Sequence, residues 1–434
     1  MQRALAHGLS PAPAVPLRFL LTAPWFAVLA ALVLLLAGAD AFASRWSASM
    51  LGATHLLTLG YLSMAMAGSM LQLIPVVTGA ALKLPRAAAG MAWGALALGA
   101  LLLSTALGLG LAGLFLPAAL LLFTAFGLLV APLARALARP APAGAMPMVR
   151  GMRLALVGLV VAVMLGLALS AHLGGHAVLP VWALADLHAA WGLVGWVAML
   201  VLGVAFQVIP MFQAAQAYPA PVTRWAPLLL AALLLGWSAA SVLAPHAAHM
   251  AGMPVAADLA AFAVLSAWLL ARRKRKEIDA TTLYWRLSLA SLAGAALVYL
   301  VVPSGEQRGM LAAVLFVGGF AMGAVNGMLY KIVPFLLWYH LQQDPRATRE
   351  SVPTIRAMVP DGAARRQFWW HAAALAALLA AVFWPQWLAR PGAALLVIAS
   401  VLLALDLGRA ARRCSLLQHS YPTLARRGSP PARG

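Results

Sequence analysis

Long apolar segments alternate with short polar connections along almost the whole chain. Each segment is about 20 residues long, the length that a helix needs to cross a hydrocarbon core of roughly 30 Å. Lipid offers the backbone no hydrogen-bond partner, and the segments are too long for the strands of a membrane barrel, so helices are expected. We therefore predict an all-α polytopic membrane protein with about 12 transmembrane helices, at residues 17–40, 51–76, 87–108, 112–134, 153–171, 181–211, 225–244, 255–271, 285–303, 309–338, 367–385 and 390–408.

One sequence pattern occurs three times, in the second, sixth and tenth predicted helices. Its form is G-x7-G-x3-[QK]-x-[IV]-P, and its prolines are 135 and 124 residues apart, so each interval contains four predicted helices. A recurrence of this kind indicates an internal repeat. The residues of the three copies are Gly60, Gly68, Gln72 and Pro75, then Gly195, Gly203, Gln207 and Pro210, then Gly319, Gly327, Lys331 and Pro334.

The repeat predicts three four-helix units, at roughly 17–134, 153–271 and 285–408, within a single transmembrane domain over residues 1–408. The three motif helices are expected to be equivalent inner helices around a pseudo-threefold axis. Their glycines share one helical stripe, where small residues allow close helix approach. Lys331 and the two glutamines then need a polar neighbour or the membrane interface, which Lys331 can reach by snorkelling. A motif that only packs helices is the alternative interpretation.

Composition and charge indicate that the chain lies in a membrane and in which orientation it crosses it. The chain is 64% hydrophobic and 9% charged, with a mean hydropathy of +0.91, which excludes a soluble globular protein. The net charge of +20 does not indicate nucleic-acid binding, because only Arg45, Arg308 and Arg390, of the 30 Lys and Arg residues, lie in outward connections. The positive-inside rule then predicts cytoplasmic termini in a bacterial inner membrane. The basic cluster 272–276 is expected to anchor this topology and to contact lipid headgroups.

The two ends of the chain carry fewer signals. The first apolar run has the length of a membrane span, so we expect no cleavable signal peptide. Residues 409–434 are predicted to form a basic cytoplasmic tail, which contains the single cysteine, Cys414, and thereby excludes a disulfide within the chain. The inward loop 339–366 has mixed charges and prolines, and its role stays open, as does the oligomeric state.

Two intramembrane histidines are the strongest candidates for chemistry. His55 precedes Pro75 by 20 residues and His188 precedes Pro210 by 22, so both lie roughly 30 Å from those prolines, near the outer interface. Because they occupy corresponding helices of two repeats, they can face each other across a shared cavity and bind a haem iron or a metal ion. The two-residue offset turns a helix by about 200°, so a bulge would be needed to match the two faces. The third repeat has no histidine at this depth.

Other polar residues are predicted on the same outer side. Two histidine pairs lie in loops, and a metal site built from His188, His246 and His249 is the best three-residue combination, with solvated turn residues as the alternative. Acidic residues there can orient an imidazole or simply cap the interface. His340 and His371 are expected in an aromatic belt at the inner interface. The weaker metal candidates are His172 and His176, and the supporting residues are Asp186, Asp258, Glu306 and Arg308.

The stretch from His55 to Gly79, with an early histidine, a glycine-rich middle and then Pro75 followed by Thr-Gly, resembles the second span of the NnrS family. NnrS proteins are twelve-span haem- and copper-containing membrane proteins connected with nitric oxide metabolism, and their fold is related to subunit I of the haem-copper oxidases. The resemblance implies that His55 is a haem-type ligand, and that His188, His246 and His249 form a copper-type set. The tenth predicted span of this chain lacks the histidines that the oxidases have there, so a proton-pumping oxygen reductase is not expected.

These observations predict a membrane protein that binds haem, with b-type as one option, and/or copper. It is expected to act in nitric oxide or oxygen-related respiratory redox metabolism, with a diatomic gas or a redox protein as its partner besides membrane lipids. Two alternatives remain open: a secondary transporter or permease, and a scaffold for the assembly of respiratory complexes. The sequence singles out no catalytic residue.

Overall fold

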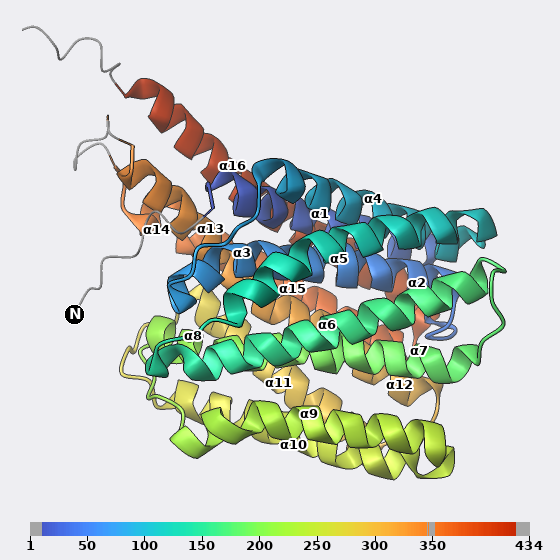
Figure 1. Ribbon diagram of the computed structural model, residues 1–434. Coiled ribbons are helices and arrows are strands. Elements are labelled where there is room, and N and C mark those ends of the chain that lie inside the picture. The colour runs from blue at the N-terminus through green and yellow to red at the C-terminus, as the bar shows by residue number, and fades with distance from the viewer. Residues whose placement is uncertain (1–10, 345, 347–351, 422–434) are drawn as a thin grey trace, which may run out of the picture.

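The computed structural model describes residues 11–344, 346 and 352–421, and contains no strand within them. Its long helices run side by side along one direction as a single bundle (Figure 1). The helices are α1 (Ala14–Ala37), α2 (Ala48–His55), α3 (Met64–Thr78), α4 (Arg86–Leu109), α5 (Phe115–Leu137), α6 (Met146–Leu173), α7 (Val181–Ala190), α8 (Met199–Gln213), α9 (Ala220–Leu243), α10 (Ala248–Ala271), α11 (Ala280–Val301), α12 (Glu306–Ala313), α13 (Met322–Gln342), α14 (Ile355–Met358), α15 (Asp361–Ala381) and α16 (Pro385–Ser420).

Within the described residues, eleven helices are long and apolar enough to cross a membrane. The prediction of a polytopic helical membrane protein is therefore confirmed. The count differs from the predicted twelve because the predicted span 367–385 falls in α15, whose first turns carry Asp361, Arg365 and Arg366 and which continues through Gln367 and His371. Helix α15 packs along α16.

The three motif-bearing spans share an unusual backbone feature. Each begins as a short α-helix, continues as a π-helical segment and ends as a longer α-helix. The π-helical segments are Leu56–Ser63 between α2 and α3, Trp191–Ala198 between α7 and α8, and Val314–Ala321 between α12 and α13. Each contains the first glycine of its motif. Such segments are rare and are concentrated at functional sites.

The motif glycines mark close helix contacts. In each span the two glycines lie against two residues, seven positions apart, on the long helix that precedes the span in sequence. A Cβ atom at any of these glycines would come within 3.0 Å of that helix or of the span's own Trp191, so larger side chains would force the helices apart. The contacts pair Gly60 with Phe26 and Gly68 with Phe19 of α1, Gly195 with Gly158 and Gly203 with Gly151 of α6, and Gly319 with Ser291 and Gly327 with Tyr284 of α11.

The motif-bearing spans form the centre of the bundle. Their most apolar stretches are 72%, 72% and 61% buried, and no other candidate span exceeds 56%. Hydrogen bonds link them directly: Trp196 Nε1 donates to Ser63 Oγ at 3.1 Å, and the Tyr61 hydroxyl donates to Asn326 Oδ1 at 2.5 Å. Buried hydrogen bonds between neutral groups of this kind fix how helices are seated in lipid.

The bundle has two chemically different ends. Helix α1 begins and α16 ends at one of them, where the cluster 272–276 also connects α10 to α11 (Figure 1); we call it the basic end. The opposite end, with Arg45, Arg308 and Arg390, is called the cavity end. The predicted tail from residue 409 begins as part of α16, because the helix continues to Ser420 and buries Cys414 against the carbonyl of Leu337. The rest of the predicted tail, 422–434, and part of loop 339–366 lie outside the described residues.

Candidate cofactor site

A large cavity penetrates the bundle from the cavity end. Its volume is about 850 Å³, and its wall is formed mostly by apolar side chains from all three motif-bearing spans and their neighbours. Arg45, Trp46 and Arg308 line it in or beside the connections at the cavity end, while His371 and Ser63 line it deeper in the bundle. A cavity of this size, with few polar groups, is typical of a cofactor or small-molecule site.

His55 and His188 face each other in this cavity, as predicted. Their ring centres are 6.1 Å apart and their planes differ by 11°. Both spans contain a bulge, in the form of the π-helical segment that begins one residue after His55 and three residues after His188. Because both spans have it, the bulge does not remove the two-residue offset between the histidines. Both side chains nevertheless reach the same cavity.

Backbone carbonyl groups hold both imidazoles. The Nδ1 atom of His55 lies 2.8 Å from the carbonyl oxygen of Leu51, and that of His188 lies 2.9 Å from the carbonyl oxygen of Ala162 in α6. Because a carbonyl oxygen can only accept, each Nδ1 must carry the hydrogen, and each neutral ring keeps a free lone pair on Nε2. Neither Nε2 atom forms a hydrogen bond with another described residue. A metal ligand with its other nitrogen bonded to the backbone has this arrangement.

The glycine at position 166 makes room for one of these rings. A Cβ atom there would lie 3.0 Å from Cε1 of His188. Any larger residue on this face of α6 would therefore push the imidazole away from the position opposite His55. The close approach of α6 to α7 thus sets the orientation of His188 from two sides, through Gly166 and through the Ala162 carbonyl.

The number of available metal ligands limits which metal ion or cofactor the site can hold. In the described part of the chain, no group of three or more His, Cys, Asp or Glu side chains is arranged to hold a metal ion. A haem needs only two axial protein ligands, because its porphyrin supplies the other four nitrogens. Two imidazoles on opposite sides of one metal have ring centres about 6 Å apart, since each metal–nitrogen bond is about 2 Å. The observed separation of 6.1 Å matches this value, for a haem iron as for a two-coordinate copper(I) ion.

The predicted metal site of His188, His246 and His249 is not assembled. His246 is exposed in the short turn Pro245–Ala247. The Nδ1 atom of His249 accepts a hydrogen bond from the Arg308 guanidinium at 3.2 Å, and its ring packs on Tyr299. A guanidinium cannot give up its proton and repels a cation, so His249 is used by the protein itself.

Neither weaker metal candidate is grouped with the histidine pair into a metal site within the described residues. His172 lines the cavity, but its Nδ1 accepts a hydrogen bond from the Leu179 amide at 3.1 Å, and His176 is exposed. Asp186 pairs with Arg45 at 3.2 Å. Glu306 accepts hydrogen bonds from the Ser44 hydroxyl and the Arg45 amide, while Oδ2 of Asp258 is buried without a partner among the described residues. The predicted role of these acids in orienting an imidazole falls to backbone carbonyls instead.

His371 was predicted in an aromatic belt, and this prediction is wrong. Its side chain is only 1% exposed and lines the cavity, while the neighbouring Trp369 and Trp370 lie at the surface. The sequence contained a signal for this position: His371, Leu375 and Leu378 are spaced to share one helix face, and all three line the cavity.

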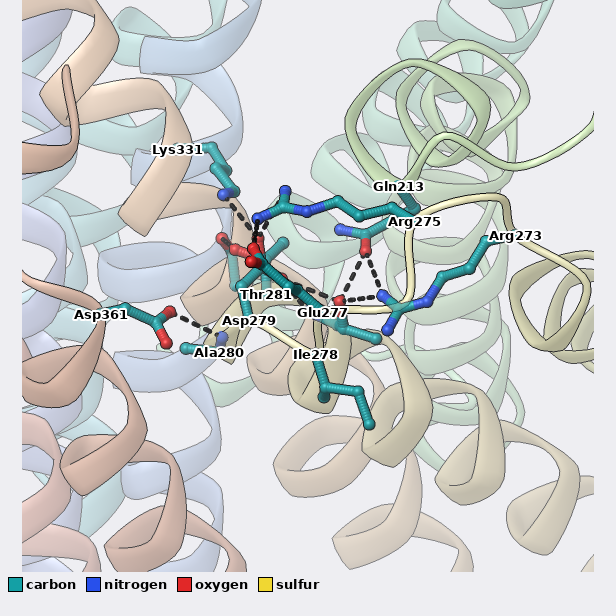
Figure 2. Close-up of polar contacts among 12 residues, drawn as sticks. Gln213, Arg273, Arg275, Glu277, Ile278, Asp279, Ala280, Thr281, Lys331 and Asp361 are labelled. Carbon is teal, nitrogen blue, oxygen red and sulfur yellow. Dashed lines mark hydrogen bonds and ion pairs between the residues drawn. The ribbon is translucent and has the colours of Figure 1, made fainter. Parts of the chain in front are cut away.

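The basic end closes the bundle with ion pairs (Figure 2). The Lys331 ammonium lies 2.9 Å from the Asp279 carboxylate, which also caps α11 by accepting a hydrogen bond from the Thr282 amide. Lys331 thus has the polar neighbour that the motif predicted, whereas Gln72 and Gln207 form no hydrogen bond with other described residues. Burial alone would raise the pKa of the Asp279 carboxyl, but the hydrogen bonds and charge of Lys331 and Thr282 bring it below its ordinary value.

A second polar contact at this end was not predicted. Gln213, the last residue of α8, accepts hydrogen bonds from the Thr282 hydroxyl at 2.7 Å and from Arg273 at 3.4 Å. Asp361 accepts a hydrogen bond from the Ala280 amide at 2.9 Å (Figure 2). These contacts tie α8, α11 and α15 together below the cavity.

Comparison with protein-family models and with curated protein sequences finds no match to this chain. The resemblance to the NnrS family therefore stays a prediction that rests on the stretch from His55 to Gly79. What the structure adds is independent of it: two neutral imidazoles, fixed by backbone carbonyls, that face one apolar cavity inside a polytopic helical membrane protein.

Proposed function

We propose that the chain consists of three four-helix units around a pseudo-threefold axis, with the layout of a haem-copper oxidase subunit I. Three observations support this: π-helical segments recur in the three motif spans, their glycines make matching contacts, and these spans are the most buried. We further propose that the basic end faces the cytoplasm of a bacterial inner membrane, since positively charged connections are retained on that side.

We propose that the protein binds haem and that His55 and His188 would hold its iron. The observation that carries this proposal is the separation of 6.1 Å between two nearly parallel imidazoles whose Nδ1 atoms are both bonded to carbonyl oxygens. A copper(I) ion bound by the same two nitrogens is the variant of this proposal that the geometry also accommodates. In both, the site serves nitric oxide or oxygen-related redox metabolism.

The protein's own contribution to such a centre follows from the cavity. The carbonyls of Leu51 and Ala162 fix the tautomer of each ring and increase the electron density on Nε2. The mostly apolar wall would keep the local dielectric low and so shift the reduction potential of a bound centre from its value in solution. A haem held there by His55 and His188 would supply one-electron redox chemistry.

The test is spectroscopic. Protein purified in detergent should show a Soret band and a positive pyridine haemochrome test, or copper at one atom per chain by elemental analysis. His55→Ala and His188→Ala should each remove that signal, whereas His340→Ala, at the end of α13, should keep it. A preparation grown with iron, copper and haem precursor that has neither a Soret band nor stoichiometric metal would reject the proposal.

A second candidate function has one specific observation in its favour. The cavity opens at one end of the bundle, beside Arg45 and Arg308, whereas the Asp279–Lys331 pair and its neighbours close the other end. Transporters that are open to only one side of the membrane have the same asymmetry. Uptake of a solute into proteoliposomes by protein without chromophore or metal, and retained in His55→Ala, would favour it.

A further inference from the structure

The mouth of the cavity carries a positive charge without a matching acid in the cavity wall. Among the described residues that line the cavity, Arg45 and Arg308 are the only ones with a permanent charge, and no Asp or Glu is among them. Arg45 forms an ion pair with Asp186, at 3.2 Å. Arg308 forms no ion pair within the described part of the chain. Its charge therefore remains free to attract an anionic group at the cavity mouth.

The Arg308 side chain is held in place by neutral partners that leave most of its donors free. Its guanidinium lies over the Tyr299 ring, 5.2 Å from the ring centre, and Nη1 donates a hydrogen bond to Nδ1 of His249 at 3.2 Å. A guanidinium has five N–H donors in one plane, so donors remain for a ligand. A planar fork of this kind matches the two oxygens of a carboxylate.

The cavity behind Arg308 suits an apolar body. His55 lies seven residues after the first residue of α2, so the histidine pair is about 10 Å below the mouth by helical rise. Arg308 is the third residue of α12, the short helix with which the third motif-bearing span begins. Leu51, Ala312 and Val314 line the wall between these two depths, and none of them is polar. A ligand held by Arg308 therefore has its remaining atoms against an apolar wall.

The single unmatched guanidinium limits the head group of such a ligand. It balances a group with one negative charge, and a carboxylate accepts two parallel hydrogen bonds from one guanidinium. A phosphate monoester has about 1.5 to 2 negative charges near neutral pH, so part of its charge would stay unbalanced beside the apolar wall. Such a charge is costly to remove from water. A carboxylate is therefore the head group that the mouth fits best.

We propose that Arg308 binds the carboxylate of an amphipathic ligand whose apolar body fills the cavity. Two sources have this chemistry: a propionate group of a haem held by His55 and His188, and a fatty acid from the surrounding bilayer. The first source rests on the proposed haem centre, whereas the second does not. In both, Arg308 sets the orientation of the ligand, with the carboxylate at the mouth and the apolar body toward the histidine pair.

The experiment compares acids with their methyl esters, which have nearly the same shape but no charge. The probes are metal-free protoporphyrin and its dimethyl ester, measured by porphyrin fluorescence, and palmitate and methyl palmitate, measured by equilibrium dialysis. Both pairs are added to the full chain in an uncharged detergent, purified from haem-depleted cells. We expect at least one acid to bind about tenfold more tightly than its ester, a ratio that corresponds to about 1.4 kcal/mol.

Variants at the cavity mouth test whether Arg308 causes this ratio. Arg308→Gln should bring the ratio of acid to ester affinity to about one, and Arg308→Lys, which keeps the charge without the planar fork, should keep part of it. Arg390→Gln removes one charge at the same end from a residue outside the cavity wall, and should keep the wild-type ratio. His55→Ala should also keep it, because neither probe pair contains iron.

The two probe pairs separate the two sources of the carboxylate. A higher affinity for protoporphyrin than for its ester supports the proposal with haem as the source, and a preference for palmitate alone supports it with a fatty acid as the source. Equal affinities of acid and ester in both pairs would overturn the proposal, as would a wild-type ratio in Arg308→Gln. Tighter binding of hexadecyl phosphate than of palmitate would overturn the assignment of a carboxylate.

Discussion

The two ends of the bundle use their polar groups in opposite ways. At the basic end, the Asp279 carboxylate is shared by Lys331, Arg275 and the Thr282 amide, so the charges are matched inside the protein. At the cavity end, the two imidazoles use one nitrogen each for the backbone and leave the other facing an apolar cavity. Polar groups that have all their hydrogen-bond partners inside the protein stabilise a fold. Polar groups that are oriented by the protein but keep a free donor or acceptor are typical of binding sites. If the cavity holds the proposed cofactor, stability and ligand binding are separated along the bundle axis.

The largest effect on stability is expected at the basic end. Asp279→Asn removes the counter-charge of Lys331, which is partly buried, and we expect the free energy of unfolding to fall by about 2 kcal/mol, a value below that of a fully buried pair because Lys331 keeps 30% exposure. Thermal or dodecyl sulfate unfolding of the purified protein measures it. Glu277→Gln, at an exposed neighbouring residue, should change the free energy of unfolding by less than about 0.5 kcal/mol. Equal effects of the two variants would show that the Asp279–Lys331 pair does not stabilise the basic end more than an exposed charge does.

A perturbation at the cavity end should separate cofactor binding from stability. Gly166→Ala places a Cβ atom 3.0 Å from His188 Cε1, so the imidazole must move. We expect loss or a clear shift of the Soret or copper signal, with a destabilisation of about 1 kcal/mol from overpacking. Gly236→Ala in α9, where a Cβ atom meets nothing within 4 Å, is the matched control. An unchanged spectrum in Gly166→Ala would argue against His188 as a ligand.

The ion pair at the basic end should also give a pH dependence of stability. The pKa of Asp279 is lowered in the folded protein, so its contribution is complete above the ordinary carboxyl pKa of about 4 and is lost as the pH falls through the lower, folded value. The melting temperature of the wild type should therefore fall more steeply below pH 4 than that of Asp279→Asn. Parallel curves for the two proteins would show that the carboxylate contributes little.

The smallest effect is expected from the ion pair at the cavity end. Arg45 and Asp186 are 3.2 Å apart, but both side chains are more than 40% exposed. Arg45→Ala should change the free energy of unfolding by no more than about 0.5 kcal/mol and leave the cofactor spectrum as it is. A loss comparable to that of Asp279→Asn would mean that both ends stabilise the bundle equally.

Several features of the site were predictable because they depend on spacing alone. The positions of His55 and His188, 20 and 22 residues before the motif prolines, placed both rings at one depth, and the structure brings them together. The motif glycines were expected at close helix contacts and are found there. His371 was misplaced because the exposed Trp369 and Trp370 beside it outweighed the helical spacing that puts its ring on the buried face.

The sequence by itself determined the helical class, the approximate spans and the unequal charge of the two ends, since each follows from local hydropathy or from the count of charges in short connections. Only the tertiary structure decided which histidines share a cavity. His246 and His249 lie outside the pair because a turn and the Arg308 guanidinium fix them. His371 is buried because its side of α15 packs against α11, where its ring contacts Tyr284. Such outcomes depend on how helices distant in sequence are seated against one another, and no local pattern encodes that arrangement.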